Sequence, residues 1–168
     1  NQHADMPEVQ LELGAFYTKT AETCFRTVRE ELRRIAPNQL YLGCRFAESN
    51  DRAVRAAATY CDIVSYNRYT DSVDDLSPPE NIDIPVIIGE FHFGALDRGL
   101  FHTGLKAART QQDRAGKYAT YVRSALRNPY LVGTHWFQYK DQPVTGRGDG
   151  ENYQIGFIDI CDKPYPEI

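Results

Sequence analysis

With 168 residues, the chain is long enough to form one domain with a single sizeable core, and its length does not require two. Its composition, 42% hydrophobic and 25% charged, excludes the disordered and collagen-like classes. The net charge is −4 and the 19 Lys and Arg residues are scattered, which excludes a nucleic-acid-binding surface and favours a neutral ligand. We therefore expect a single domain over residues 1–168, with a tail over 140–168.

No apolar run in the sequence is long enough for a membrane span, so no membrane partner is expected. The first ten residues are neither basic nor apolar enough for a signal peptide, and the compartment is not indicated. The four cysteines form no CxxC pair and fall mostly within apolar segments: Cys24, Cys44, Cys61 and Cys161. This pattern predicts buried free thiols rather than a disulfide framework.

The first part of the chain predicts two helices with a strand between them. Apolar residues recur every three or four positions from Leu13 to Ile35, which indicates an amphipathic helix that Pro37 stops. A short apolar run over 39–47 then predicts a buried strand. The second helix extends to Tyr60, and Asp51 is expected to cap its start.

The remainder of the sequence alternates between apolar runs and polar connections. The predicted elements are, in order, a strand over 62–69, a loop over 71–79, a strand over 84–92, a loop over 93–108, a helix over 111–127 and a strand over 131–139. Strands that alternate with helices imply an α/β fold with a parallel sheet. Four such strands fit either an open doubly wound sheet or half of a closed barrel, and the pattern alone does not choose between them.

Polar side chains that are costly to bury follow the apolar part of each predicted strand. They are Arg45, Asn67 with Tyr69, Glu90 with His92, and His135 with Trp136 and Gln138. In a (β/α)8 barrel the carboxyl ends of the strands converge on the active site. The distribution therefore favours a barrel with a site at these strand ends.

Several motifs in the chain resemble those of one known family. They are Tyr41–Ala47, Val64–Tyr69, Ile87–Gly99, and His135–Tyr139 with the following Asp141-Gln142-Pro143. In this order they look like the family-fifty β-agarases, which are glycoside hydrolases, and the resemblance extends from about Phe16 to the end of the chain.

The resemblance implies half of a (β/α)8 barrel, with the four βα units corresponding to its fifth to eighth strands. It implies that Glu90 is the catalytic nucleophile, that Tyr69 hydrogen-bonds it, and that Trp136 forms the floor of a sugar subsite. The family also places an Asn-Glu pair at the end of its fourth strand as the acid/base. This chain has no such pair, so the catalytic pair is incomplete in it.

A retaining glycosidase needs two carboxyl groups, one to attack the anomeric carbon and one to protonate the leaving oxygen. Hydrogen bonds from Tyr69, and from Arg45, are expected to keep Glu90 ionised and aimed. The chain is thus interpreted as a fragment of a retaining, galactan-cleaving enzyme. The alternative is an inactive half barrel that at most binds carbohydrate, and a third interpretation is a hydrolase of another polysaccharide.

Each of these residues also has an interpretation without function. Glu90 fits an ion pair with an arginine, Arg45 fits a pair with Glu48, and Trp136 fits an ordinary core position. The remaining expected sugar contacts rest on less specific signals in the sequence: Asn67, His92, His135, Asp141 and Gln142. No HxH or HExxH spacing supports a metal site, and no cofactor is expected.

A parallel half barrel has two unpaired apolar edges, which soluble proteins rarely tolerate. The edges here are predicted over 40–46 and 131–137. We therefore expect a homodimer in which the first strand of one chain pairs with the last strand of the other, rebuilding an eight-stranded barrel.

Overall fold

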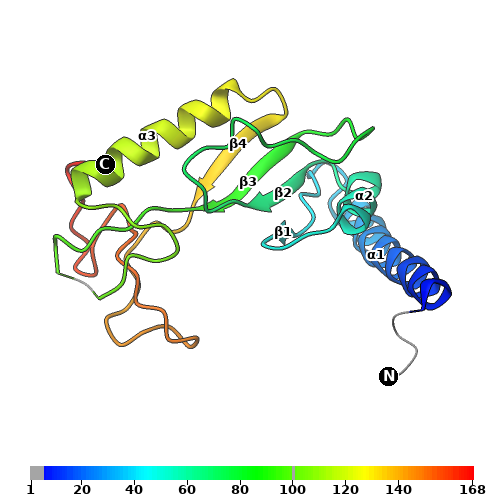
Figure 1. The fold of residues 1–168 in the computed structure, drawn as a ribbon, viewed down its shortest axis with the longest axis horizontal. Helices are drawn as coiled ribbons and strands as arrows, with labels where there is room; N and C mark the ends of the chain where they lie inside the picture. The colour runs from blue at the N-terminus through cyan, green and yellow to red at the C-terminus, as the bar shows by residue number, and fades with distance from the viewer. Residues whose placement is uncertain (1–5, 100) are drawn as a thin grey trace. The chain divides into compact units, whose positions relative to one another are not determined.

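The computed structural model of the protein describes residues 6–99 and 101–168 (Figure 1). The predicted strand and helix order is confirmed, with shorter strands than expected. The elements are α1 (Pro7–Ile35), β1 (Arg45–Phe46), α2 (Asp51–Tyr60), β2 (Val64–Asn67), β3 (Val86–Phe91), α3 (Gln111–Arg127) and β4 (Leu131–Trp136). The strands form one parallel sheet in the order β1-β2-β3-β4, so the α/β prediction is confirmed.

The described residues divide into two compact units. The first comprises the chain up to residue 65 together with residues 77–86, and the second comprises residues 66–76 and 87–168. Strands β2 and β3 therefore begin in the first unit and end in the second.

In the first unit, α1 packs against α2. α1 begins at Pro7, which is suited to the first turn of a helix because its missing N–H would have no partner there. α2 buries Ala53, Val54, Ala56 and Ala57. Its cap is Asn50, whose side chain accepts a hydrogen bond from the Ala53 N–H at 3.0 Å, so the prediction that Asp51 caps the helix is wrong.

The strand predicted over 39–47 is reduced to the two residues of β1. Gly43 has a φ of +67°, a left-handed conformation that an extended strand does not contain. A Cβ at this position would lie 2.8 Å from the Cys61 Sγ, so the close approach also requires a glycine. In addition, the Tyr41 N–H donates to the Asp62 carboxylate at 2.7 Å.

In the second unit, the core lies between the sheet and α3, which runs beside β4 (Figure 1). Ile88 and Phe91 of β3 are almost fully buried. The ring of Phe91 stacks on Tyr121 of α3, with 4.0 Å between ring centroids and an interplanar angle of 7°. α3 has its predicted bounds, and the side chain of Thr110 caps it by accepting from the Asp113 N–H at 3.1 Å.

The segment after β2 has no regular structure, as predicted for 71–79. Two buried side chains from the end of α3 hold it. The Ser124 hydroxyl accepts from the Val73 N–H at 2.9 Å, and the Asn128 amide donates to the carbonyls of Val73 and Leu76, both at 2.8 Å. The loop is thus attached to the helix through its backbone groups.

All four cysteines are free, as predicted, but only Cys61 is buried. The prediction of burial is wrong for Cys24, Cys44 and Cys161, which are exposed. Burial raises the pKa of the Cys61 thiol to about 12. Within the described ranges, no helix combines the length and the apolar character that crossing a membrane requires.

Candidate active site

The centre of the candidate site is a hydrogen-bonded pair of side chains at the ends of two neighbouring strands, and both residues belong to the second unit. Glu90 is the last residue but one of β3, and Tyr69 follows the end of β2. The Tyr69 hydroxyl donates to Oε2 of Glu90 at 2.7 Å. The backbone joins the same two segments, since the Arg68 N–H donates to the Glu90 carbonyl at 2.9 Å. The half-buried carboxylate is therefore held in one orientation at the carboxyl end of the sheet.

His92, two residues after Glu90, is 1% exposed, and both of its ring nitrogens face backbone groups. Nε2 accepts from the Leu105 N–H at 2.8 Å, and Nδ1 lies 3.1 Å from the Phe137 carbonyl. Because Nε2 must be unprotonated to accept and Nδ1 must carry the proton to donate, these contacts fix a neutral ring. Burial lowers the pKa of His92 to about 4, in agreement with that state.

The fixed imidazole supports Tyr69 from the side. The two rings meet edge to face, with 4.7 Å between their centroids. The His92 ring also requires a glycine at position 104. Gly104 has a φ of +73°, and a Cβ there would lie 2.4 Å from Nε2 of His92. His92 thus connects the loop after β3 to the Tyr69–Glu90 pair. With both nitrogens engaged, it has no ring nitrogen left for a sugar hydroxyl.

Trp136, at the end of β4, lies in an aromatic cluster that includes α3. Its ring stacks on Phe157 with 5.4 Å between centroids, and it meets Phe91 at 5.1 Å and Tyr118 at 5.4 Å, both edge to face. The indole N–H donates to the Ile155 carbonyl at 2.7 Å. These contacts are those of a packing residue, which was the interpretation of Trp136 without function.

Asp141 and Gln142 are also occupied within the protein. Asp141 is 3% exposed, and its two oxygens accept from the Gly156 N–H at 2.7 Å and from the Tyr165 hydroxyl at 2.6 Å. The Gln142 amide donates to Glu151 at 2.8 Å and accepts from the Tyr153 N–H at 2.8 Å. Both side chains therefore fasten the C-terminal tail to the end of β4.

Three further predicted site residues lie on β1, β2 and β4. Arg45 lies in the first unit and is exposed. Asn67, the last residue of β2, has a buried side-chain oxygen without a hydrogen-bond partner. His135 is exposed on β4. Within the second unit, a hydrogen bond and a ring contact bring Tyr69, Glu90 and His92 together.

Three buried residues that sequence reasoning missed hold the tail around Asp141. Arg114 of α3 is fully buried and donates to the Gly156 carbonyl at 2.8 Å, and its guanidinium lies 4.7 Å from the Tyr165 ring centroid. The Gln154 amide donates to the Tyr165 hydroxyl at 2.8 Å. Burial, followed by the bond to Asp141, raises the pKa of Tyr165. No sequence motif marks these residues, because the contacts join positions far apart in the chain.

The described residues include no group of three or more His, Cys, Asp or Glu side chains arranged to hold a metal ion. The chemical capacity of the site rests on the Glu90 carboxylate. A carboxylate that is fixed by a phenol and held at the end of a parallel strand is suited to nucleophilic attack on an electrophilic carbon. Retaining glycoside hydrolysis also requires a second carboxyl group as acid and base.

Comparison with known proteins identifies close relatives. The chain is 48% identical over 171 residues to β-agarase B of Vibrio sp. (strain JT0107), covering 98% of this chain and 17% of the relative. It is 50% identical over 151 residues to β-agarase A of the same organism, covering 84% of this chain and 15% of the relative. Among solved structures, the agarase AgWH50C superimposes with a TM-score of 0.90 at 48% identity, covering 97% of this chain and 24% of that one.

No protein-family model matches the chain. The chain spans about a sixth of the length of the curated relatives that it matches. The matches at close to half identity cover nearly all of its residues, and they agree with the resemblance of the sequence motifs. Over the segment that it spans, the chain closely resembles the β-agarases of glycoside hydrolase family fifty.

Proposed function

We propose that the chain is part of a retaining glycoside hydrolase that cleaves β-galactosidic bonds of agarose-type galactans, with Glu90 as its nucleophile. The observation that carries the proposal is the 2.7 Å hydrogen bond from Tyr69 to Glu90 at the strand ends, in a chain about half identical to β-agarases. In this proposal the four strands correspond to the fifth to eighth strands of a (β/α)8 barrel, whose active site lies at the carboxyl ends of its strands.

Glu90 attacks the anomeric carbon of the galactosyl residue, and the bond from that carbon to the leaving oxygen breaks. The leaving oxygen takes a proton from an acid that this chain does not supply. Water then attacks the glycosyl-enzyme, gives its proton to the same acid/base, and releases Glu90 as a carboxylate. Tyr69 fixes the orientation of the carboxylate through its hydrogen bond to Oε2.

Of the other predicted contacts, Asn67 fits a sugar-binding role best. Its buried side-chain oxygen has no partner and is available to accept from a sugar hydroxyl. His135 and Arg45 stay predicted contacts on the basis of their exposure and of the resemblance. His92 supports Tyr69, and Trp136, Asp141 and Gln142 support the tail.

The test is covalent labelling of Glu90 by an activated 2-deoxy-2-fluoro-galactoside. An aryl or fluoride leaving group needs no protonation, so the label forms without the acid/base, whose loss costs about 10² to 10⁴ in rate on ordinary substrates. Peptide mass spectrometry should find the sugar on Glu90, and Glu90→Gln should abolish labelling. Glu80→Gln, at an exposed carboxylate, is the matched control and should label as the unchanged chain does.

Tyr69→Phe should slow labelling at Glu90 by about tenfold, since it removes one hydrogen bond to the carboxylate. Agarose itself should be hydrolysed barely above background by the 168-residue chain alone. Labelling at another carboxylate, or agarose hydrolysis that survives Glu90→Gln, would refute the assignment.

The homodimer stays a proposal with a weaker basis than the sequence suggested. β4 has an exposed Val132 and lies at one edge of the sheet, which favours pairing there. β1 offers only two residues to such a ladder. Light scattering at micromolar concentration should detect a dimer, and a monomer would remove this proposal without affecting the role of Glu90.

A further inference from the structure

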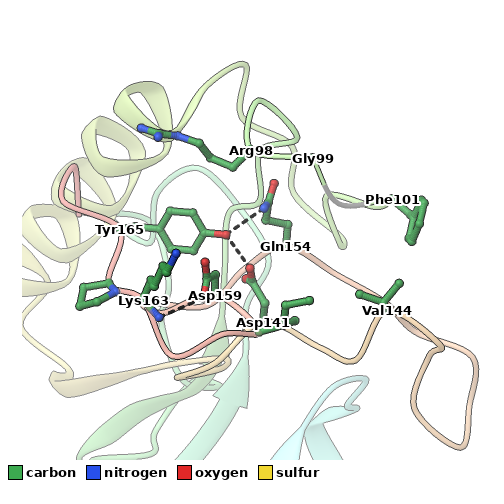
Figure 2. Close-up of a pocket in the computed structure, with 11 residues that line it drawn as sticks. Arg98, Gly99, Phe101, Asp141, Val144, Gln154, Asp159, Lys163 and Tyr165 are labelled. Atoms are coloured by element: carbon green, nitrogen blue, oxygen red, sulfur yellow. Dashed lines mark hydrogen bonds between the residues drawn. The ribbon is translucent and has the colours of Figure 1, made fainter.

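A cavity of about 480 Å³ lies in the second unit among the loops that follow β3 and β4 (Figure 2). Its polar lining comes from Arg98, Asp141, Gln154, Asp159, Lys163 and Tyr165. None of Tyr69, Glu90 or His92 lines it. From its buried amide acceptor, its balanced charges and its apolar rim, we propose that this cavity binds one neutral sugar residue.

The acceptor is the side-chain oxygen of Gln154. The residue is 2% exposed, and this oxygen has no hydrogen-bond partner. Its orientation follows from its neighbours: the single proton of the Tyr165 hydroxyl is donated to Asp141 at 2.6 Å, so the hydroxyl accepts only the N–H side of the Gln154 amide, at 2.8 Å. The amide oxygen therefore points away from Tyr165, toward the segment of Arg98 and Gly99 (Figure 2).

A buried acceptor without a partner is costly and is normally satisfied by a donor. The ligand must therefore present a hydroxyl or an N–H to Gln154. Hydroxyl groups are the donors that a sugar carries in the largest number.

The charges around the cavity compensate one another. Arg98 forms an ion pair with Glu167, and Arg114 lies close enough to Asp141 to interact with its charge. Lys163 interacts with Asp159, whose carboxylate also accepts the Lys163 backbone N–H at 2.9 Å. A ligand with a net charge would thus meet groups of its own sign as well as groups of the opposite sign, which favours a neutral ligand over a uronate or a sulfated sugar.

The remaining lining supplies apolar surface at the rim. Phe101 is 64% exposed, and Val144 and Ile160 are each 40% exposed. An exposed aromatic ring beside hydrogen-bonding groups suits the C–H face of a pyranose. The volume is within the range of roughly 300 to 1,000 Å³ that is typical of small-molecule sites.

The identity of the sugar, a galactosyl residue of the galactan, rests on the proposed function. The site itself does not, because it shares no residue with the Tyr69–Glu90 pair. Such a site would hold a galactan chain at a second point and raise the concentration of substrate near Glu90.

The test is a nuclear magnetic resonance titration of the ¹⁵N-labelled 168-residue chain with a neutral disaccharide released from agarose. The side-chain amide of Gln154 and the backbone amides of Lys163 and Tyr165 should shift and saturate. Galacturonate should bind at least about tenfold more weakly, since its carboxylate is not compensated.

Three variants refine the test. Gln154→Met keeps the volume but removes the acceptor, and should weaken binding by about tenfold. Val144→Trp narrows the cavity from its rim and should abolish binding, whereas Leu126→Trp, at an 81% exposed position of α3, should bind as the unchanged chain does. If Gln154→Met does not fold, Val144→Trp still decides.

Shifts confined to residues near Glu90, unchanged binding by Val144→Trp, or equal affinity for galacturonate would overturn the proposal. Labelling of Glu90 by the fluoro-galactoside is measured separately. If labelling fails while the Gln154 shifts persist, the proposed function is wrong and the sugar site stands. If Glu90 is labelled but the Gln154 signals do not shift, only the sugar site is wrong.

Discussion

The strongest prediction concerns the pH dependence of folding that His92 imposes. His92 is buried and neutral, and its pKa is lowered from 6.5 to about 4 by burial. Between these two values the imidazole is protonated in the unfolded chain but not in the folded one. The unfolded state then binds more protons, so the free energy of unfolding must fall as the pH falls through this range.

The magnitude follows from the two pKa values. One pKa unit corresponds to about 1.4 kcal/mol. The shifted pKa of His92 therefore lowers the free energy of unfolding by about 3 kcal/mol when the pH falls from neutral to near 4. Between about pH 7 and pH 5, the linkage relation gives a loss of about 2 kcal/mol. This is a large fraction of the stability of a typical domain.

Urea unfolding followed by far-ultraviolet circular dichroism at the two pH values measures this loss. The matched variant is His92→Gln, which removes the titrating group and retains an amide donor and acceptor. It should be less stable at neutral pH but should lose about 2 kcal/mol less than the unchanged chain on acidification. If both proteins lose the same stability, or if the His92 ring titrates near its ordinary pKa, the reasoning is refuted.

Two further predictions concern buried backbone and side-chain contacts. Gly104→Ala should destabilise the protein by about 2 to 4 kcal/mol, because the new Cβ would meet the His92 ring in a left-handed conformation. Gly116→Ala, in α3 with open space around it, should instead stabilise by up to about 1 kcal/mol in the same unfolding assay, and equal effects at the two glycines would contradict the geometry. Asn128→Ala should cost about 2 to 4 kcal/mol, because it leaves two loop carbonyls unpaired; Leu126→Ala, 81% exposed, should change stability by less than about 0.5 kcal/mol, and a similarly small effect of Asn128→Ala would show that the loop is not held there.

Local signals in the sequence determined which elements were predicted well. α3 has its predicted bounds, and its end is marked in the sequence by Asn128 followed by a proline; the structure adds Thr110 as the cap at its start. α1 begins earlier than predicted. The sequence did not indicate this start, because most of residues 7–12 are exposed and carry no apolar period. β1 is shorter than predicted because the backbone of Gly43 is left-handed, which an apolar run does not reveal.

In the candidate site, too, some residues were predicted from the sequence and others were not. Tyr69 and Glu90 were singled out from strand-end positions and the family resemblance, and the hydrogen bond expected between them is present. Gln154, Tyr165 and Arg114 were not predicted, because their contacts depend on the tail folding back onto Asp141 and Gly156. Trp136 faces the aromatic cluster of α3, and strand alternation alone did not indicate that face.

The fluorescence of Trp136 indicates whether the C-terminal tail is attached. It is the only tryptophan in the sequence, and Ile155 and Phe157 supply its hydrogen bond and its stacking partner. Detachment of the tail would expose the indole to water and shift its fluorescence emission to longer wavelength, while the helices stayed folded. Tyr118 of α3, with its ring 5.4 Å away, would keep its energy transfer to the indole, because neither residue lies in the tail, and only global unfolding would end that transfer. Intrinsic emission therefore distinguishes local release of the tail from global unfolding without any added label.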